Sequence, residues 1–412
     1  MAYELAYETN LKSFNRPHII VVGAGLSGLA ASLEIEKLGG SVTILERTKS
    51  LGGRIKTDQL NGFLLDHGFQ VLLTSYPELK RLHISDSLNL KPFLSGAICH
   101  RDHSSYRLIN PFRHFFRFLA NIHNISMDTY LDFLKLARII YSKVSLTCST
   151  DKLLKKKSIS FDFRHHFLDP FFGGVFLDTK LDARAQIFVK YLRLFLCGFA
   201  TLPEQGMQAL PKAIHNKLKN TRILFNQEVK EVAEKSVVLT NGDRISGDAV
   251  IVAVDNPAYK ALVKGSWAIE SKSVRCFYFS APKGQIKKTP FLHVGNNGPI
   301  SNLCVPNHIQ PSYAPKGFDL ISATVVGPDW QKKSDLQKHV EENVSSWLSI
   351  AKESLSLIKS YYIEHALPTQ KTPPMLYNEV KMKGFETVFL AGEMVQLPSI
   401  KDRKSTRLNS SH

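Results

Sequence analysis

The feature that most constrains the fold is a glycine turn between two apolar stretches near the N-terminus. The run from His18 to Val22 predicts a buried parallel strand, and Gly23, Gly25 and Gly28 follow it in the pattern GxGxxG. The alanine- and leucine-rich residues after this pattern predict a helix, and a second apolar run then ends on Glu46. A strand, a glycine turn, a helix and a second strand ending on an acid together predict a nucleotide-binding βαβ unit.

Each residue of this pattern has a physical reason. Gly23 permits a tight turn, Gly25 lets a pyrophosphate approach the backbone, and Gly28 lets the helix pack close to the strand. The free amides at the start of the helix would bind the phosphates. Glu46 would accept hydrogen bonds from a ribose, and its charge disfavours a 2′-phosphate, which argues against NADP. The alternative is a plain glycine turn followed by a surface glutamate.

The residues after Glu46 indicate which dinucleotide is bound. The stretch ERTKSLGGRIKT places Gly52, Gly53 and Arg54 shortly after the acid. This arrangement resembles the extended signature of the flavin amine oxidase and phytoene desaturase superfamily. The resemblance implies FAD as the cofactor, with the two glycines lining its phosphates and the arginine beside them.

The next stretch, LLDHGFQVLL, is similar to the following landmark of the same family, in which a glycine turn passes near the flavin. Gly68 is the glycine of this turn. The adjacent Asp66 and His67, taken alone, are typical of a turn more often than of a catalytic pair.

The second half of the cofactor domain is expected from Arg222 onward. The residues predict a strand, a hairpin turning at Asn241-Gly242, and a buried strand from Ala249 to Val254. The resemblance implies that the backbone around Val229 lies against the adenine, whereas a plain β-meander is the alternative reading.

A last apolar strand, in TVFLAGEMVQLPSI, resembles the closing flavin motif of the family. Its Gly392 and Glu393 would contact the ribityl chain, and Ser399 would introduce a helix facing the phosphates. The full set of residues expected to bind FAD is Gly23, Gly25, Leu26, Ser27, Gly28, Glu46, Arg47, Gly52, Gly53, Arg54, Gly68, Val229, Gly392, Glu393 and Ser399.

The expected fold class is α/β, with a Rossmann-like FAD-binding domain built from discontinuous segments and an inserted α+β substrate domain. The FAD-binding domain is expected at residues 17–75, 205–265 and 380–401, and the substrate domain at residues 76–204 and 266–379. Residues 1–16 are expected to form a short tail. Since no second GxGxxG occurs, a separate NAD(P)H domain is not expected.

The substrate domain carries the least specific signals. The phenylalanines and glycines of residues 171–174 are expected either to line an apolar substrate cavity or to pack in a helix-turn-helix core. Amine oxidases of the superfamily carry a lysine that binds a water beside the flavin, and Arg275 stands at the similar position in SVRCFYFSAP. Arginine stays charged and cannot serve as a neutral base, which weakens the case for amine oxidation. Arg275 is the one weak catalytic candidate.

The expected function is that of an FAD-dependent dehydrogenase or desaturase that removes a hydride from an apolar small-molecule substrate, with O2 or a quinone reoxidising the flavin. One alternative is a flavin amine oxidase that releases peroxide. The other is a flavin-free lipid- or prenyl-binding module, because prenyl-binding escort proteins resemble this fold. The chain has neither a GxSxG nucleophile motif nor an HExxH metal helix, and its histidines are scattered, so no metal site is expected.

Composition limits the partners and the compartment. The net charge is +17, but no nucleic-acid-binding motif accompanies it, so nucleic acid is not an expected partner. The 5 widely spaced cysteines favour reduced thiols and a cytoplasmic location. The stretch from Asn110 to Val144 alternates basic and aromatic residues at helical spacing, which fits either a peripheral membrane helix or a core helix with a basic face. The oligomeric state is left open.

The C-terminal residues differ in character from the rest of the chain. The segment DRKSTRLNSSH, residues 402–412, can be encoded by a common sequencing-library adapter read in frame, so we expect it to be non-native. A genuine basic tail is the alternative. On the first reading, the given sequence is truncated after about Ile400, and we expect the natural chain to continue into the Gly-Ala-containing helix of the family, which completes the flavin site.

Overall fold

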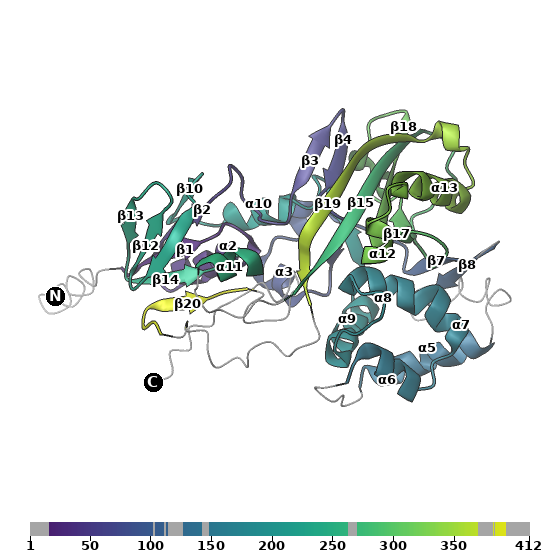
Figure 1. Ribbon diagram of the computed structural model, residues 1–412, viewed down its shortest axis with the longest axis horizontal. Helices are drawn as coiled ribbons and strands as arrows, with labels where there is room; N and C mark the ends of the chain where they lie inside the picture. Colours follow the sequence, from purple (N-terminus) through teal and green to yellow (C-terminus); the bar gives the residue numbers. More distant parts are fainter. Residues whose placement is uncertain are drawn as a thin grey trace, which may run out of the picture. The chain divides into compact units, whose positions relative to one another are not determined.

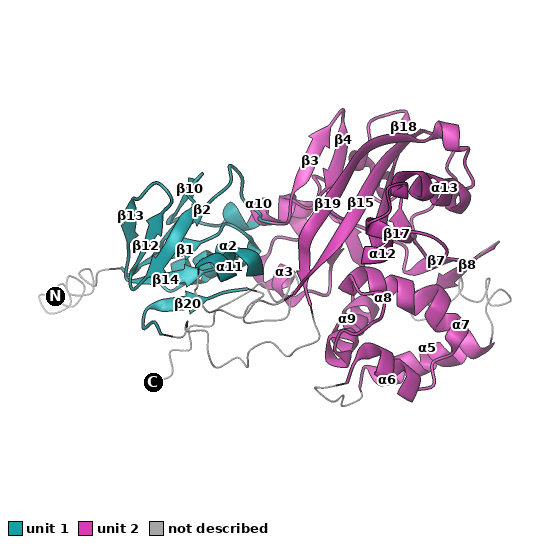
Figure 2. Ribbon diagram, in the orientation of Figure 1, with its two compact units in different colours: residues 1–53, 214–268, 374–412 teal, residues 54–213, 269–373 magenta. Residues whose placement is uncertain are grey.

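The computed structural model describes residues 16–101, 104–110, 113, 127–141, 148–262, 270–369, 382 and 384–392. The chain divides into two compact units (Figure 2). Unit 1 comprises Met1–Gly53, Ile214–Ala268 and Pro374–His412, and unit 2 comprises Arg54–Ala213 and Ile269–Pro373. Residues 54–75 and 205–213, which the sequence assigned to the cofactor domain, thus belong to unit 2. The functional division into a cofactor domain and a substrate domain stays a prediction.

Unit 1 is built on a five-stranded parallel sheet whose strand order is β10-β2-β1-β14-β20 (Figure 1). The strands are β10 Thr221–Phe225, β2 Ser41–Glu46, β1 His18–Val22, β14 Ala249–Val252 and β20 Val388–Leu390. Helix α2, Leu26–Lys37, connects β1 to β2, and α11, Asn256–Leu262, follows β14. The central strands β1, β2 and β14 are mainly apolar because both faces of such a sheet are covered, whereas β10 at the edge carries the exposed Arg222. Ile20, Val21, Ile44 and Val250 are accordingly fully buried.

A small antiparallel sheet completes the described part of unit 1. It contains β11 Val229–Ala233, β12 Ser236–Leu239 and β13 Arg244–Ser246. The turn between β12 and β13 closes where the Gly242 amide donates to the Leu239 carbonyl, at 3.0 Å. Gly242 has a φ of +92°, which a glycine adopts without strain. The hairpin therefore turns at Asn241-Gly242.

Unit 2 is built on a seven-stranded sheet of order β19-β15-β18-β17-β16-β7-β8 (Figure 1). The strands are β19 Ser356–Pro368, β15 Ser271–Pro282, β18 Phe318–Val326, β17 Ile300–Cys304, β16 Leu292–Gly295, β7 Gly96–His100 and β8 Ser105–Ile109. All neighbours are antiparallel except β16 and β7. Helix α13, Leu336–Leu348, packs its Val340, Val344 and Trp347 against one face, where they meet Phe277 and Phe279.

The other face of this sheet packs against a short hairpin. The hairpin consists of β3 Thr57–Leu60 and β4 Phe63–Asp66. Phe63 and Leu65 share a buried cluster with Tyr278, Tyr313 and Tyr361. The hairpin is therefore held to the sheet by large aromatic side chains, which bury much apolar area at low entropic cost. A second small sheet contains β5 Leu72–Leu73, β9 Ala200–Leu202 and β6 Lys91–Pro92.

Helices make up most of the remaining described part of unit 2. They are α3 Pro77–Leu82, α5 Met127–Ile139, α6 Thr150–Lys156, α7 Phe161–Phe163, α8 Asp169–Phe176, α9 Ala185–Cys197, α10 Ala209–His215, which runs into unit 1, and α12 Pro328–Gln331, with a π turn at Arg164–Leu168. Short 3-10 helices lie at Asp86–Leu88, Pro306–His308, Pro311–Tyr313 and Lys352–Ser354. Ser149 caps α6 by accepting from the Lys152 amide, which satisfies one of the free donors of its first turn. None of the helices in the described ranges is both long and apolar enough to cross a membrane.

The stretch around Phe172 is a packed core. Phe172 is 1% exposed, and its ring lies 4.6 Å from that of Phe188 and 5.6 Å from that of Phe176, between centroids. Gly174 faces the sheet: a Cβ there would lie 2.4 Å from Nδ2 of Asn302. The packed-core reading therefore describes these two residues, and the glycine lets α8 approach β17.

Candidate functional site

The glycine turn of unit 1 presents an open helix start. β1 ends at Val22, the Gly23 amide donates to the Leu45 carbonyl at 2.8 Å, and α2 begins at Leu26. Gly25 is the N-cap residue, and no side chain caps the helix or places an acid in its first turn. The first amides of an α-helix have no partners within the helix, and the helix dipole favours negative charge there. This end of α2 is therefore suited to an anion such as a phosphate.

The three glycines of the turn are required for different reasons. A Cβ on Gly28 would lie 1.9 Å from the Gly23 carbonyl oxygen, and one on Gly23 would lie 2.8 Å from the Ala253 carbonyl oxygen. A Cβ on Gly25 would meet nothing within 4 Å. Gly23 and Gly28 are thus required by the fold itself. Gly25 is not required by the fold in this way, and the approach of a pyrophosphate to its backbone stays a prediction.

A second pair of glycines packs against the first turn. The Gly52 amide donates to the Ala24 carbonyl at 2.9 Å, and Gly25 and Gly52 form a parallel bridge. A Cβ on Gly53 would lie 3.3 Å from the Gly25 Cα. The sequence analysis expected both glycine groups at the cofactor, and the structure brings Gly25 and Gly52 together.

Glu46 lies at the end of β2 beside this turn and is 6% exposed. Its Oε2 accepts from the Ala24 amide at 2.9 Å, and its Oε1 accepts from the amide and the hydroxyl of Thr48, at 2.9 and 2.8 Å. The carboxylate is therefore held by two backbone amides, that of Ala24 in the glycine turn and that of Thr48 after β2. Carboxylate oxygens have about four acceptor positions in all, so capacity for a ribose hydroxyl remains.

The last described strand, β20, ends beside the start of α2. Gly392 follows β20, and a Cβ there would lie 2.7 Å from the Ser27 hydroxyl in the first turn of α2. Val229 begins β11 and is paired with Leu239, while Arg47 is an exposed residue after β2. Glu393 and Ser399 lie outside the described residues. The cofactor contacts expected for all of these residues stay predictions.

Two expected cofactor residues belong to unit 2. The Arg54 guanidinium donates from Nη1 to the carbonyls of His365 and Ala366, at 3.3 and 3.1 Å. Gly68 has a φ of +82°, and a Cβ there would lie 3.0 Å from Cδ1 of Ile363. Both residues are thus fixed against β19.

The structure places Arg275 on the opposite side of β15 from the Gly68 turn. Gly68 is close to Ile363 and Val274, which are paired across β19 and β15. Arg275 follows Val274, and successive side chains of a strand point to opposite faces. Its guanidinium lies 5.2 Å from the centre of the Tyr362 ring. Arg275 and Gly68 are therefore not brought together.

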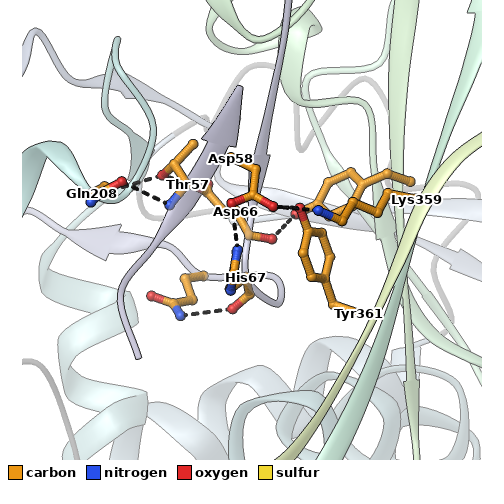
Figure 3. A network of polar contacts seen from close by, with 9 residues as sticks. Thr57, Asp58, Asp66, His67, Gln208, Lys359 and Tyr361 are labelled. Atoms are coloured by element: carbon orange, nitrogen blue, oxygen red, sulfur yellow. Dashed lines mark hydrogen bonds and ion pairs between the residues drawn. The ribbon is translucent and has the colours of Figure 1, made fainter. Parts of the chain in front are cut away.

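Asp66 is a buried carboxylate with three hydrogen-bond donors around it. Figure 3 shows it beside Thr57, one of the three. Its Oδ1 accepts from the Thr57 hydroxyl at 2.5 Å and the Met207 amide at 2.9 Å, and its Oδ2 accepts from the Tyr313 hydroxyl at 2.9 Å. Burial raises the pKa of Asp66 to about 6, although these hydrogen bonds oppose the rise. Asp66 ties the hairpin to distant parts of unit 2.

A second, accessible polar cluster joins the same hairpin to β19, and we call Asp58, His67, Lys359 and Tyr361 the Asp58 cluster (Figure 3). Asp58 accepts from Nε2 of His67 at 2.9 Å, from the Lys359 ammonium at 2.6 Å and from the Tyr361 hydroxyl at 2.7 Å. Burial alone would raise the pKa of Asp58, but these three donors outweigh burial and hold that pKa well below its usual range. Asp58 is therefore a stable carboxylate.

The sequence did not reveal this cluster. Asp66-His67 was visible as an adjacent pair, but His67 pairs with Asp58, and Lys359 is 301 residues away from Asp58 in the chain. The one available signal was the hairpin itself, in which Asp58 and Leu65 are directly opposite. Among the described residues, no group of three or more histidine, cysteine or acidic side chains could hold a metal ion.

Comparison with known proteins identifies partial relatives. The chain is 26% identical over 284 residues to the zeta-carotene-forming phytoene desaturase of Myxococcus xanthus, covering 60% of this chain and 55% of the other. It is 31% identical over 91 residues to protoporphyrinogen oxidase 2, chloroplastic/mitochondrial, of Arabidopsis thaliana, covering 22% and 18%. The chain thus matches about half of the length of the first relative and less than a fifth of the second.

Solved structures share the fold over nearly the whole chain. An oxidoreductase from Methanosarcina mazei is 15% identical, with a TM-score of 0.76, and the match covers 94% of this chain and 98% of that one. Putrescine oxidase bound to putrescine is 14% identical, with a TM-score of 0.68, covering 94% and 96%. These likenesses and the parallel sheet of unit 1 confirm the expected α/β, Rossmann-like fold.

The family assignment rests on the chain as a whole. The profile described as flavin containing amine oxidoreductase matches residues 26–400. This match confirms FAD as the expected cofactor and gives the flavin-free alternative no support. The chain therefore belongs to the flavin-containing amine oxidoreductase family.

Proposed function

We propose that this chain is an FAD-dependent oxidoreductase that removes a hydride from an apolar substrate, as a desaturase or dehydrogenase does, and that O2 or a quinone reoxidises its flavin. The observation that carries the proposal is the start of α2, where no side chain caps the helix and Gly25 leaves open space. A helix start of this kind stabilises a pyrophosphate by its free amides and its dipole.

The residues of unit 1 would bind the adenosine diphosphate part of FAD. The amides of Leu26 and Ser27 would hold the phosphates, with Gly52 and Gly53 alongside. Glu46, already fixed by three hydrogen bonds, would accept from the ribose. The other residues proposed to contact FAD are Arg47, Val229 and Gly392 in unit 1 and Arg54 and Gly68 in unit 2. Two more, Glu393 and Ser399, lie outside the described residues. When bound, FAD would supply the hydride acceptor.

The substrate is proposed to be apolar. Relatives include the phytoene desaturase of Myxococcus xanthus and the 4,4'-diaponeurosporene oxygenase of Staphylococcus aureus, both named for carotenoid compounds. An amine oxidase is the second candidate, favoured by the likeness to putrescine oxidase. Two observations on β15 weigh against it: Arg275 cannot become a neutral base, and Lys272 is held by Asp178 at 3.0 Å.

The test of the cofactor site is the variant Gly25→Ala. Gly25 has a φ of −72°, which alanine adopts readily, and its Cβ has room, so the fold should be unaffected. We expect an unchanged melting temperature without flavin and a loss of FAD affinity of about tenfold or more, because the methyl group occupies the space of the pyrophosphate. Flavin fluorescence quenching measures the affinity.

The matched control is Gly173→Ala in α8, where the added Cβ makes only ordinary contacts, the nearest at 3.6 Å. This variant should bind FAD as the unaltered chain does. An unaltered chain that binds no FAD, or a Gly25→Ala variant with full affinity, would contradict the proposal.

The substrate class is tested by anaerobic bleaching of the bound flavin. Phytoene in detergent, protoporphyrinogen and putrescine serve as the three probes. We expect phytoene or another apolar probe to bleach the flavin and putrescine to leave it oxidised. Bleaching by putrescine alone, with peroxide formed on admitting air, would instead support the amine oxidase.

We also propose peripheral association with a membrane as the route of an apolar substrate. On α5, Met127, Tyr130 and Leu131 are exposed, and Lys135 links this helix to the Ser158 carbonyl, next to the lysines of residues 155–157. Exposed apolar and basic side chains together favour an anionic interface. Flotation with anionic vesicles tests this: we expect binding at low salt that weakens in Leu131→Ser, and no binding at low salt would contradict it.

A further inference from the structure

Two buried histidines join the last two strands of the seven-stranded sheet in unit 2 to the rest of that sheet. Strands β7 and β8 form a ribbon at one end, and β16 is the strand of the described sheet that pairs with this ribbon (Figure 1). His100 ends β7, and His293 lies on β16. Nε2 of His100 lies 2.9 Å from Nδ1 of His293, and Nε2 of His293 lies 2.7 Å from the Thr289 hydroxyl. We call His100 and His293 the histidine pair.

The histidine pair is closely packed beside helix α13. His100 is 5% exposed and His293 is 3% exposed. The His100 ring stacks on Trp347, with 4.3 Å between centroids and 3° between planes. A Cβ on Gly295 would lie 2.8 Å from Cζ2 of Trp347 and 3.2 Å from Cβ of His100, so β16 approaches both side chains closely. Both rings are therefore shielded from water.

Hydrogen bonding limits the attached pair to one added proton. The two facing nitrogens share one hydrogen, so at least one of them is unprotonated, and the two rings cannot both be imidazolium at this distance. A single imidazolium would be a buried charge. Among the described residues, the two rings contact each other, Thr289 and Trp347, and none of these partners is acidic. The face of Trp347 would offset only part of the cost of burying that charge.

The pKa values follow from this environment. Burial lowers the pKa of His100 from 6.5 to about 4, and burial together with the neighbouring His100 and His308 lowers that of His293 to about 3. His308 lies beyond Thr289, whose amide donates to its Nδ1 at 3.1 Å. Unlike the histidine pair, His308 has an acidic partner, Asp319, at 3.2 Å.

The other ionisable groups on the surrounding elements pair mainly with one another. On α7 and the π turn, the pairs are Arg101 with Asp162, Arg164 with Asp151 and Asp169, and His166 with Asp162. On α13, the pairs are His339 with Asp335 and Lys352 with Glu341 and Glu342. The remaining groups are His165, which stacks on Phe161, Lys283 and Lys288 near His308, and the exposed Arg107 and Lys338.

We propose that the histidine pair is an acid-sensitive switch, which holds the β7–β8 ribbon on the sheet while both rings are neutral and releases it when both take up protons. The proposal does not depend on the proposed function. Arg101, directly after β7, bonds to Asp162 of α7 at 2.7 Å, so release of the ribbon would also loosen its connection to this helix.

The direction of the pH dependence follows from the two states. In the released state both rings reach water and bind protons near pH 6.5, whereas in the attached state they bind protons only at lower pH. The attached state is therefore fully favoured above about pH 6.5 and loses stability as pH falls from there toward about 4. Because two protons are taken up on release, the ratio of released to attached ribbon rises by up to about hundredfold per pH unit.

Cys99 reports whether the ribbon is attached. It precedes His100 on β7 and is fully buried, as are Cys276 on β15 and Cys304 on β17, whereas Cys197 is exposed. The full chain is treated with dilute 4,4′-dithiodipyridine between pH 7.5 and 5, and peptide mass spectrometry gives the rate at each cysteine. Each thiol displaces one thiopyridone from the reagent and forms a mixed disulfide. Division by the rate of Cys197 removes the intrinsic pH dependence of this exchange.

We expect the normalised rate of Cys99 to rise about a thousandfold from pH 7.5 to 5 while Cys276 and Cys304 stay protected. H293Q keeps a group that donates and accepts but removes one titrating ring, so the rise should fall to about thirtyfold. The double variant H100F/H293Q should show no rise. H339Q, which alters a paired histidine of α13, is the matched control and should keep the full rise.

Three results would overturn the proposal. The first is a Cys99 rate that does not rise with acid. The second is equal labelling of Cys99, Cys276 and Cys304, which would mean that the whole sheet unfolds rather than the ribbon alone. The third is a full rise in H100F/H293Q, which would assign the effect to other groups. If the double variant does not fold, H293Q decides, because a rise equal to that of the unaltered chain excludes the histidine pair. The assay needs no flavin, so it gives an answer even if the proposed function fails.

Discussion

The glycine turn of unit 1 and the hairpin of unit 2 are built by opposite means. The turn is formed by backbone groups. Carbonyl oxygens crowd the positions that Cβ atoms of Gly23 and Gly28 would take, and free amides form the start of α2. The hairpin is instead held by side chains. Asp58 and Asp66 accept hydrogen bonds from the side chains of Thr57, His67, Tyr313, Lys359 and Tyr361.

This difference determines how each region tolerates change. At Gly23 and Gly28 the backbone leaves no spare space, so one added methyl group there displaces several elements together. A network of side chains can lose one member and retain the others, provided that no buried group is left unsatisfied. We therefore expect steric effects in unit 1 to exceed polar effects in unit 2, and the following variants test that order.

The largest effect is expected for Gly28→Ala. The new Cβ would lie 1.9 Å from the Gly23 carbonyl oxygen and 3.2 Å from Cγ1 of Val21, so α2 must move away from β1. Overpacking of this severity costs about 3 kcal/mol or more in the free energy of unfolding. Urea unfolding followed by circular dichroism measures the loss. Gly25→Ala, in the same turn, should be neutral in this assay, and equal losses in the two variants would contradict the steric account.

The next effect is a pH dependence from Asp66. Its pKa is raised by burial from 3.8 to about 6, so the folded chain binds the proton more tightly than the unfolded chain. Stability from this group is therefore full at low pH and falls as pH rises from about 4 to about 6. The difference between the two pKa values corresponds to about 3 kcal/mol. Asp66→Asn should remove this part of the pH dependence.

The measurement is the difference in unfolding free energy between Asp66→Asn and the unaltered chain from pH 4.5 to 8. We expect the difference to shift in favour of the variant as pH rises, and then to level off. Asp58→Asn is the control from the same hairpin. The pKa of Asp58 is held low, so its titration lies at acid pH and the corresponding difference should stay constant over this range. A constant difference for both variants would refute the account of Asp66.

The contrast also explains what the sequence could predict. Gly23, Gly25 and Gly28 follow one another in one short segment, and each excludes every other residue type or leaves room for a ligand, so their spacing is informative. The strands of unit 1 were likewise predicted closely: β1 was expected at His18–Val22 and is found there, and β14 begins at Ala249 as expected. Local patterns determine these features.

Features that depend on distant pairs could not be read in this way. Asp58 meets Lys359, and Asp66 meets Tyr313 across 247 residues, yet each is a common residue type in an ordinary context. Arg275 illustrates the same limit, because the side of β15 on which it lies depends on its pairing with Tyr362 and Val325. A motif match predicts that Arg275 lies on a strand, but it does not predict which residues its side chain contacts.

A smaller effect is expected for Glu46→Gln in unit 1. Both carboxylate oxygens accept from donors, so the amide group of glutamine would face an N–H or O–H group on one side. Leaving one buried donor unpaired costs about 1 to 2 kcal/mol. Glu34→Gln on α2, where the acid pairs with Lys37, is the surface control and should change little. If the two variants are equally stable, Glu46 does not organise the turn.

The smallest effect is expected for Lys359→Gln. Its ammonium contacts Asp58 at 2.6 Å, but both side chains are more than a third exposed, and an exposed ion pair contributes about 0.5 kcal/mol. Asp58 keeps His67 and Tyr361 as donors, so no group becomes unsatisfied. Chemical unfolding at two salt concentrations measures the loss, with Lys37→Gln as the matched surface pair in unit 1. A loss above about 2 kcal/mol would mean that the Asp58 cluster acts as a unit, and the hairpin would then resemble the glycine turn in its intolerance of change.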